Sequence, residues 1–516
     1  MAKRKGRAHR RRRRRQAEET RVAAVGVNIS HEMVYVQLRK WLKSECFTGF
    51  HLVPASFPGS GRGLMSTRAL QPGELVIALP EKCLLTTRTV LRSYLGEYIE
   101  RWKPRLSPLQ ALCMFLIAER HFGSQSPWKP YIDVLPKSYT CPVYFTEGSI
   151  RLLPSPLIKK FREQKTAVQE LYLTSKCFFD SLQPLFSESV ENIFTYDALC
   201  WAWCTVNTRT IYMKHEQSEF FSREPDVYAL APYLDLLNHT PTAQVSAAFN
   251  QQSKCYEIRT LTKCQRYEQV FICYGPHDNQ RLLLEYGFVA GSNPHSVVYV
   301  DKDFLRCHLS LKDKLLNGKL LFLQDQGLLE NLTFGRDGPS WRLLTALKVA
   351  CLTAEEYSLR KNISLGLYVS DENERSSLEL AERLCLHLMN ENQKVIQQFS
   401  KLSDDGAEIS EQLELVAALR REEFGILQAS MQVLQDMKIA TLRGLHCSVN
   451  HNIIPELAIR QENVTCAASQ NYDSYCMNKQ SSGELQCQRK QNASKNCYQK
   501  MKCSSTMSNY QHCLTL

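Results

Sequence analysis

The chain has 516 residues, of which 44% are hydrophobic and 22% are charged. This composition is typical of a folded globular protein and excludes global disorder, and the length predicts two to four domains. The longest apolar stretch, 111–118, ends at Glu119 and is too short to span a bilayer. The first residues, MAKRKGR, lack the apolar core of a secretory signal. We therefore expect no membrane contact and a location in the nucleus and cytoplasm.

Positive charge is concentrated at the N-terminus. Of the net charge of +12, ten charges lie among the first fifteen residues, including six consecutive arginines at 10–15. Such a run repels itself and buries nothing, so residues 1–28 are predicted to form a disordered basic arm. Residues 3–15 could contact an import receptor or a polyanion such as nucleic acid. The alternative is a solvated terminus whose basicity is incidental.

The twenty cysteines do not indicate disulfides or zinc. Without a secretory signal, reduced thiols are expected. Cys200 and Cys204 are the only close pair before residue 440, and no second pair matches them. The seven cysteines after residue 440 are 6 to 19 residues apart, which is not the spacing of a zinc module. We therefore predict no metal.

The central part of the chain predicts an α+β fold. A helix is expected around Val34–Leu42, a strand at Leu75–Leu79, and a helix at Ser107–Phe122 with Ser107 as N-cap. Helical periodicity then dominates up to about Asn207. Strand patterns return at Val245–Phe249, Cys255–Leu261 and Gln269–Tyr274. Two β-rich parts, 46–149 and 209–290, are thus predicted to flank a helical insert at 150–208.

A separate helical lobe is predicted at 300–440. From Ser340 onwards the apolar residues recur with helical periodicity, and the last two helices read as a hairpin around Asp404-Asp405-Gly406. The lobe is expected to be all-helical. Residues 441–516 are polar and without periodicity, which predicts a disordered, cysteine-containing tail.

Three segments carry candidate chemistry. Gly59-Ser60-Gly61-Arg62-Gly63-Leu64 permits close approach of a ligand to the backbone, although a simple tight turn explains it equally. Asp235, Asn238 and His239 lie in an apolar run, where burial demands partners from a core network or a ligand. A strand leads to Tyr274-Gly275, and Tyr286-Gly287 repeats the pairing twelve residues later. Each tyrosine alone would be read as core.

Together and in this order, the segments GRGL, DLLNH, VFICYG and LEYGF resemble the SET domain of the branch typified by the plant Rubisco large-subunit methyltransferase. The resemblance covers about residues 30–440. It implies a SET β-fold with a pseudoknot, a helical insert and a C-terminal helical lobe that binds substrate. It also implies that S-adenosyl-L-methionine donates a methyl group to a protein substrate.

The resemblance assigns roles to individual residues. The backbone of Ser60, Gly61 and Arg62 would hold the methyl donor with help from the Arg209 side chain. Asn238 and His239 would bind it largely through backbone atoms, with Asp235 nearby. Tyr274 would be the principal catalytic tyrosine, and Tyr286 a second tyrosine lining the same site. Thr240-Pro241 follows the Asn-His pair, and no Cys-x-Cys zinc cluster flanks the domain, so the helical lobe must help to close the lysine channel.

The expected activity is that of a protein-lysine N-methyltransferase of the SET type (class V), acting on histones, on non-histone proteins or on both. A sister in the same branch methylates a histidine of actin, so a protein-histidine N-methyltransferase is the alternative enzyme. Ile211 and Leu234 are apolar where the resemblance implies polar or large aromatic residues in that sister, which favours lysine. A non-catalytic chromatin-associated adaptor that docks through the basic arm is the alternative of another class.

Overall fold

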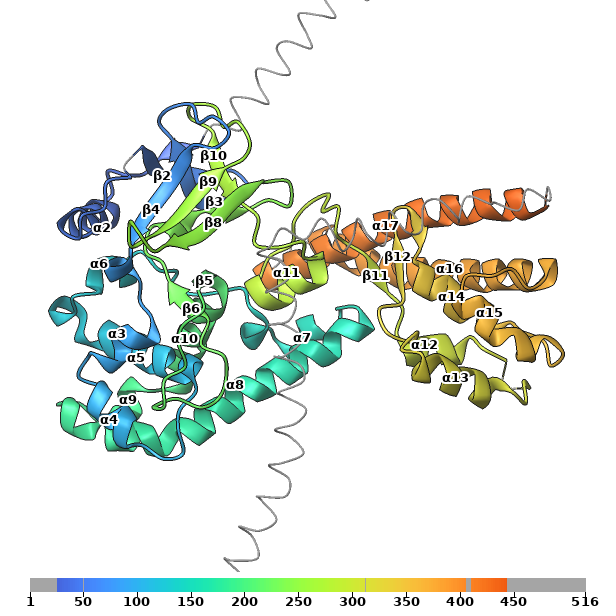
Figure 1. Cartoon of the computed structure of the whole chain (residues 1–516), viewed down its shortest axis with the longest axis horizontal. Coiled ribbons are helices and arrows are strands. Elements are labelled where there is room, and N and C mark those ends of the chain that lie inside the picture. Colours follow the sequence, from blue (N-terminus) through green and yellow to red (C-terminus); the bar gives the residue numbers. More distant parts are fainter. Residues whose placement is uncertain (1–25, 50, 311, 405–409, 443–516) are drawn as a thin grey trace, which may run out of the picture. The chain divides into compact units, whose positions relative to one another are not determined.

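The computed structural model describes residues 26–49, 51–310, 312–404 and 410–442 (Figure 1). The basic segment 3–15 lies outside these ranges. So does the predicted tail 441–516, except for its first two residues, which belong to the last helix. The prediction of a disordered arm is wrong at its end, because Val27–Asn28 form strand β1, paired with Ser56 and Ala55. Both side chains are exposed, so no alternation of hydrophobic residues marks this strand in the sequence.

The first sheet combines strands from both β-rich parts of the sequence. Its order is β1-β2-β3-β10-β7, with β2 at Leu52–Phe57, β3 at Gly61–Ser66, β7 at Asn238–His239 and β10 at Gln269–Ile272. Neighbouring strands are antiparallel except β10 and β7, which run parallel with Phe271 opposite Asn238 and Ile272 opposite His239. Strand β10 ends two residues before the predicted end at Tyr274.

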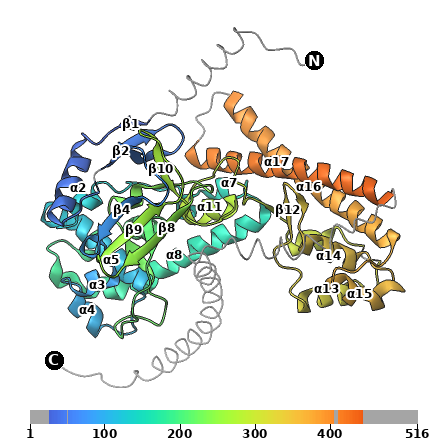
Figure 2. The same cartoon turned by 45° about the horizontal axis from the view of Figure 1, so that its top comes forward.

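Two smaller sheets lie in the same part of the chain. One has the order β4-β9-β8, with β4 at Leu75–Pro80, β8 at Val245–Asn250 and β9 at Cys255–Thr260, so strands coloured blue and green lie side by side (Figure 2). The other pairs β5 (Thr210–Tyr212) with β6 (Tyr228–Leu230). The strands predicted from alternating hydrophobicity are confirmed within one or two residues at each end.

Helices accompany these sheets at the predicted places. Helix α5 begins with Ser107 as N-cap, whose Oγ accepts a hydrogen bond from Gln110 N at 3.1 Å, and Pro108 occupies the first turn. The insert forms one long helix, α8, followed by α10 after a short α9. The helices up to α11 are α2 (Met33–Ser44), α3 (Thr87–Leu91), α4 (Gly96–Arg101), α5 (Pro108–Phe122), α6 (Lys129–Ile132), α7 (Glu147–Ile150), α8 (Ser155–Ser181), α9 (Val190–Ile193), α10 (Tyr196–Arg209) and α11 (Asn279–Tyr286).

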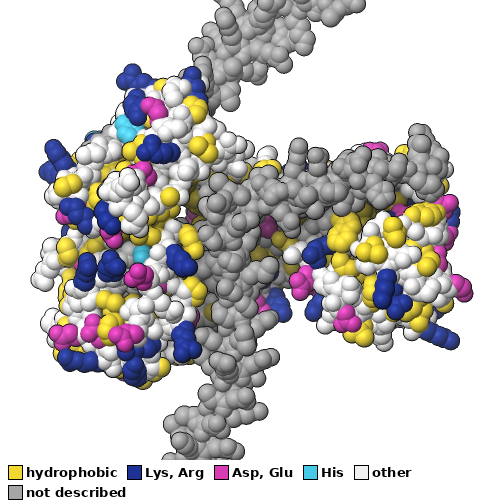
Figure 3. All heavy atoms as spheres, viewed as in Figure 1, with side chains coloured by type: hydrophobic (Ala, Val, Ile, Leu, Met, Phe, Trp, Pro, Cys, Tyr) yellow, Lys and Arg dark blue, Asp and Glu magenta, His cyan; other side chains and the backbone are white. Residues whose placement is uncertain are grey.

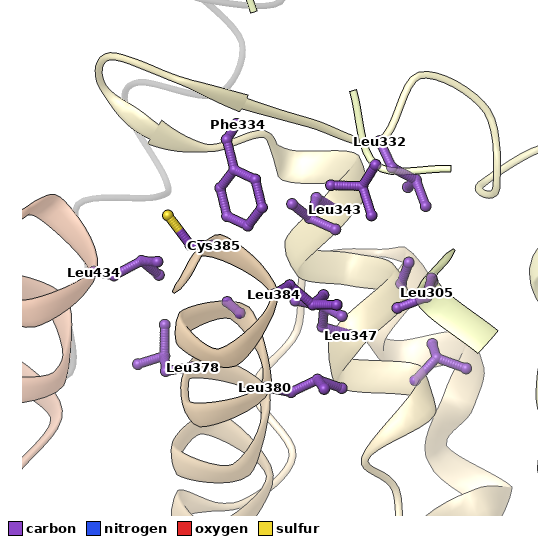
Figure 4. Packing of buried hydrophobic residues seen from close by; sticks show 14 of the residues in the cluster. Leu305, Leu332, Phe334, Leu343, Leu347, Leu378, Leu380, Leu384, Cys385 and Leu434 are labelled. Carbon is purple, nitrogen blue, oxygen red and sulfur yellow. The ribbon is translucent and has the colours of Figure 1, made fainter. Parts of the chain in front are cut away.

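The C-terminal lobe has its own hydrophobic core (Figure 4). Leu305, Phe334, Leu347, Leu384 and Leu434 are among its buried residues. Its helices are α12 (Lys302–Cys307), α13 (Leu316–Asp325), α14 (Trp341–Ala350), α15 (Arg360–Ser364), α16 (Asp371–Asp404) and α17 (Glu411–Leu442). The helical lobe is confirmed, but it is not all-helical. It includes a sheet of three strands that are too short to show a hydrophobic period in the sequence: β11 (Val298–Tyr299), β12 (Thr333–Gly335) and β13 (Gly338–Pro339).

Helix α17 contributes to two cores. Its first half, with Val416, Ala417 and Leu419, packs with Phe145, Phe161 and Leu283, which come from α11 and the chain around α7 and α8. Its second half, with Ile426, Leu427 and Leu434, belongs to the core of the helical lobe. One continuous helix therefore connects the lobe with the part of the chain that contains α11.

Candidate active site

The parallel pairing of β7 with β10 brings the Asn-His segment beside the strand that leads to Tyr274. After the pairing of Ile272 with His239, Thr240 N donates to Ile272 O at 3.0 Å. Beyond Ile272, Tyr274 N donates to His239 Nδ1 at 3.0 Å. Residues 35 positions apart in the chain are thus held in one network of backbone and side-chain hydrogen bonds.

The turn between β2 and β3 is built on glycine. Gly59 and Gly61 have φ angles of +83° and +69°, and no atom lies within 4 Å of the position that a Cβ would occupy at either. Gly63 is different, since a Cβ there would lie 2.7 Å from Gln269 Oε1 and 2.8 Å from Asn238 Nδ2. The turn is therefore open on one side and in close contact with β7 and β10 on the other.

The Asn238 side chain fastens this turn. Its Nδ2 donates to Arg62 O at 3.0 Å, Ser60 O at 3.4 Å and Gln269 Oε1 at 2.8 Å. Gln269 in turn donates from Nε2 to Ser60 Oγ at 2.8 Å. The amide nitrogen of Asn238 is thus occupied within the protein. Gln269 was not identified from the sequence, where an alternating strand residue carries no signal of this role.

Arg209 and Asp235 form a buried ion pair. Arg209 Nη1 lies 3.1 Å from Asp235 Oδ2, and their side chains are 17% and 2% exposed. Tyr131, also not predicted, donates its hydroxyl to the same carboxylate oxygen at 2.9 Å. Burial lowers the pKa of Arg209, but the Asp235 carboxylate more than offsets this and raises it above its usual value. Asp235 therefore holds Arg209 in place, and Arg209 Nε remains buried without a hydrogen-bond partner among the described residues.

His239 is neutral at physiological pH. Burial lowers its pKa to about 4. Because Nδ1 accepts the Tyr274 N–H, the ring carries its proton on Nε2. This Nε2 is buried and has no hydrogen-bond partner in the part of the chain that the structure describes. An N–H donor without a partner at this position is an unsatisfied group that a bound molecule can satisfy.

An aromatic cluster surrounds His239. The ring of Tyr274 lies 5.1 Å from that of His239 and 5.0 Å from that of Tyr286, and Phe288 lies 5.9 Å from His239 and 6.3 Å from Tyr286. The Tyr274 hydroxyl donates to Leu237 O at 2.8 Å. The two tyrosines predicted as a pair are thus neighbours, and Phe288 is a member that the sequence did not single out.

The structure also gives the positions of the other residues predicted for the site or its walls. Arg62 Nη1 donates to Val134 O at 2.8 Å, so its side chain is anchored in the protein. Ile211 lies in β5 and is half-buried, whereas Leu234 is buried in the turn before Asp235. Within the described ranges, no three His, Cys, Asp or Glu side chains are arranged to hold a metal ion. None of the described helices is long and apolar enough to cross a membrane.

This fold and motif set define a class of protein. The family models for the SET domain and for the Rubisco LSMT substrate-binding domain match residues 61–275 and 310–427. The chain therefore belongs to the SET-domain proteins that carry a Rubisco LSMT-type substrate-binding domain.

The chain is similar in sequence or structure to several individual proteins of this class. The chain is 53% identical to SET domain-containing protein 4 of Homo sapiens over 442 residues, 85% of this chain and 100% of the relative. It is 30% identical to the actin-histidine N-methyltransferase of Rhinolophus ferrumequinum over 63% of this chain and 54% of the relative. The structure of Rubisco LSMT bound to sinefungin and monomethyllysine superposes with a TM-score of 0.55 at 20% identity, covering 83% of this chain and all of that one. The expected family and fold are confirmed.

Proposed function

We propose that this SET-domain methyltransferase is a protein-lysine N-methyltransferase that uses S-adenosylmethionine and acts on histone or non-histone proteins. One observation carries the proposal. The parallel pairing of β7 with β10 collects the glycine turn, the Asn-His segment and Tyr274 at one place. These elements are distant in sequence, and their meeting is what a SET methyl-transfer site requires.

The residues present fit the methyl donor. S-adenosylmethionine is the donor of the family, and it is bound in a structure of Rubisco LSMT that superposes on this chain with a TM-score of 0.53. Two buried groups, His239 Nε2 and Arg209 Nε, lack partners among the described residues, and the β2–β3 turn is open beside Gly59 and Gly61. Backbone atoms of Ser60, Gly61, Arg62, Asn238 and His239, with Arg209, would hold the donor. When bound, the donor supplies a methyl group on a positively charged sulfonium.

Tyr274 and Tyr286 suit the orientation of a lysine amine. The Tyr274 hydroxyl donates to Leu237 O at 2.8 Å, and a phenol oxygen can also accept a hydrogen bond from an amine. Alignment is the main requirement of a direct displacement, and groups about 3–3.5 Å apart react fastest when held in line. Enclosure of a lysine amine by these half-buried rings would lower its pKa, and the amine must lose its proton before it attacks.

The choice of lysine over histidine rests on two apolar residues that are close in sequence to Arg209 and Asp235 of the site. Leu234 is 1% exposed and Ile211 is half-buried, so neither offers a polar partner to an imidazole ring. Lysine has an aliphatic stem that suits an apolar wall. Monomethyllysine is the ligand in one Rubisco LSMT structure of this fold. A histidine acceptor remains the second candidate because the actin-histidine N-methyltransferases are relatives of this chain.

The adaptor alternative is weakened by the surface charge. Lys and Arg side chains are mixed with Asp and Glu over the visible face of the described residues (Figure 3). A module that binds nucleic acid through its folded part usually gathers basic side chains on one face.

We propose that the basic segment 3–15 directs the protein to the nucleus. Catalysis belongs to the folded part, in the nucleus or the cytoplasm.

A methyl-transfer assay with mass spectrometry tests this proposal. The full-length protein is incubated with isotope-labelled S-adenosylmethionine and a panel of histones, actin and non-histone peptides. We expect label on a lysine side chain, with no label when the Tyr274→Phe variant replaces the protein. Label on a histidine would establish the second candidate instead, and a panel without label would support the adaptor.

A further inference from the structure

Helix α11, which ends with Tyr286, is fastened to α17 by a buried pair of side chains. Gln280 on α11 donates from Nε2 to Glu423 Oε1 on α17 at 2.7 Å. Both side chains are almost fully enclosed, with 4% and 2% of their surface exposed. The pair therefore connects the helix that carries Tyr286 with the helix that enters the core of the C-terminal lobe.

Each residue of the Gln280–Glu423 pair has one side-chain oxygen without a hydrogen-bond partner among the described residues. Gln280 Oε1 and Glu423 Oε2 are both buried, and neither has a hydrogen-bond partner among the residues that the structure describes. An ionised carboxylate has only acceptors, so it cannot satisfy the amide oxygen of Gln280. A protonated carboxyl group has one O–H donor, and its Oε2–H can donate to Gln280 Oε1 while its Oε1 still accepts from Nε2. Protonation of Oε2 would thus supply the donor that Gln280 Oε1 lacks.

We propose that Glu423 is a positioning residue that holds α11, and with it Tyr286, through an acid–amide pair with Gln280 that forms when Glu423 is protonated. The assignment of Tyr286 to the acceptor site rests on the proposed function. The attachment of α11 to α17 does not, since it follows from the contacts of the pair itself.

The surroundings of Glu423 favour its protonated form. Burial raises its pKa to about 7, against the opposing effects of the Arg420 charge and the Gln280 hydrogen bond, and Asp278 at the N-cap of α11 raises it further. Arg420 directs its Nε to Leu152 O and its Nη1 to Asn392 Oδ1, and the charge of Glu391 on α16 faces it. The charged groups facing Glu423 are therefore Arg420 and Asp278, and both forms of the carboxyl group are populated at neutral pH.

Further hydrogen bonds also attach α11 and its two ends to neighbouring segments. Gly287 O accepts from Thr140 Oγ1 at 2.6 Å, Leu284 O accepts from Gln164 Nε2 at 3.1 Å, and Asp278 accepts from Tyr299 at 2.7 Å. Ionisation of Glu423 therefore weakens one attachment among several. We expect a graded effect on the order of α11 and not its detachment.

Amide hydrogen exchange of residues 279–286 in the full-length protein, measured between pH 6 and pH 8, tests the proposal. Glu423→Gln keeps a donor and an acceptor for Gln280 at every pH, whereas Glu423→Ala has neither. In the wild type, protection corrected for intrinsic exchange should fall as pH rises through 7 by about fivefold, the effect of losing one hydrogen bond. Glu423→Gln should keep its protection at all pH values, and Glu423→Ala should be less protected throughout.

Two further variants keep the test decisive. Glu414→Gln makes the same chemical change at an exposed position of α17 and should behave as the wild type. If Glu423→Ala does not fold, Gln280→Met removes the amide from the other side and should show the same low protection. The proposal is overturned if Glu423→Gln keeps the pH dependence of the wild type, or if Gln280→Met is protected as well as the wild type.

Kinetics connect the pair to methyl transfer. Gln280→Met should lower kcat by about fivefold, in line with one lost hydrogen bond, while the Kd for S-adenosylmethionine stays the same within error. An unchanged kcat would remove the functional part of the proposal. If even the wild type transfers no methyl group, the proposed function fails, and hydrogen exchange still decides whether the pair holds α11.

Discussion

Asp235 and His239 lie four residues apart in one segment, yet burial affects them in different ways. Asp235 is paired with Arg209 at 3.1 Å and accepts a second hydrogen bond from Tyr131. His239 stays neutral because burial lowers its pKa to about 4, with a further lowering by His295. Asp235 thus holds the charged Arg209 side chain in place. The neutral ring of His239 is oriented by the hydrogen bond from Tyr274 N.

Removal of the Asp235 charge should destabilise the protein. Asp235→Asn leaves Arg209 as a buried cation without its counter-ion, which lowers the free energy of unfolding by about 3 kcal/mol, and the loss of Arg209 geometry should weaken donor binding. Urea denaturation and calorimetric titration with S-adenosylmethionine measure the two effects. Asp133→Asn is the control, because Asp133 forms an exposed ion pair with Lys129, whose loss changes stability by less than about 1 kcal/mol. Equal stability losses in both variants would contradict the buried role of Asp235.

The His239 environment predicts a pH dependence of stability. Its folded-state pKa of about 4 lies below the ordinary value of 6.5, so between these values the unfolded chain binds more protons than the folded one. The free energy of unfolding should therefore fall as pH decreases from 6.5 to 4. His239→Asn should make this dependence less steep but not abolish it, because burial also lowers the pKa values of His51, His277 and His295. Substitution of the exposed His31 by Asn is the control. Denaturant titrations at several pH values provide the measurement. An unaltered pH profile of stability in His239→Asn would show that His239 does not contribute to this dependence.

Much of the site could be predicted at the level of single residues, but its supporting side chains could not. Asp235, Asn238, His239 and Tyr274 stand in short motifs, where residue type and order are informative. Tyr131 contacts Asp235 across 104 residues of sequence, and Gln269 contacts Ser60 across 209. No local pattern encodes such long-range partners, because they are set by the folded arrangement of the strands.

At the scale of elements, the end of α11 shows how a backbone conformation positions Tyr286. Gly287 caps the helix in the left-handed region with φ of +77°, and a Cβ there would lie 2.8 Å from the backbone C and O of Thr140. Thr140 Oγ1 also donates to Gly287 O at 2.6 Å. The residue directly after Tyr286 is therefore confined by sterics and by a hydrogen bond.

Gly287→Ala should destabilise the protein and slow methyl transfer. The left-handed conformation costs about 1–3 kcal/mol for a residue with a side chain, and the contact with Thr140 adds to it. Thermal unfolding and the methyl-transfer rate measure both effects. Gly291→Ala is the matched control, because a Cβ there meets no atom within 4 Å. A Gly287→Ala variant as stable and as active as Gly291→Ala would show that this cap does not position Tyr286.

Long elements were predictable and very short ones were not. Helix α5 and strands β4, β8 and β9 extend over enough residues for hydrophobic periodicity to reveal them. Strand β7 has two residues, and β11 and β13 have two each, too few for any period. The family resemblance implied a pseudoknot, but no pattern of residues predicted the pairing of β7 with β10, on which the site depends.

At the scale of the whole molecule, the folded part and the basic segment 3–15 are proposed to have separate roles. Ten of the twelve net positive charges lie in the first fifteen residues. Deletion of residues 1–15 should leave the methyl-transfer rate in vitro unchanged and reduce nuclear accumulation of the protein in cells. Fluorescence imaging of the tagged protein and the transfer assay measure the two outcomes. If deletion abolishes both activity and binding to nuclear partners, the segment is more than a targeting signal.

Tyr274 is proposed to orient the acceptor for methyl transfer. The Tyr274→Phe variant removes the hydroxyl that donates to Leu237 O and keeps the ring that packs against His239 and Tyr286. Single-turnover transfer from labelled S-adenosylmethionine, with the Kd of the donor measured in parallel and the exposed Tyr267→Phe as control, tests the claim directly. We predict a rate lower by about 100-fold or more, as expected for lost alignment, with donor binding largely retained. An undiminished rate of methyl transfer in Tyr274→Phe would show that Tyr274 does not have this role.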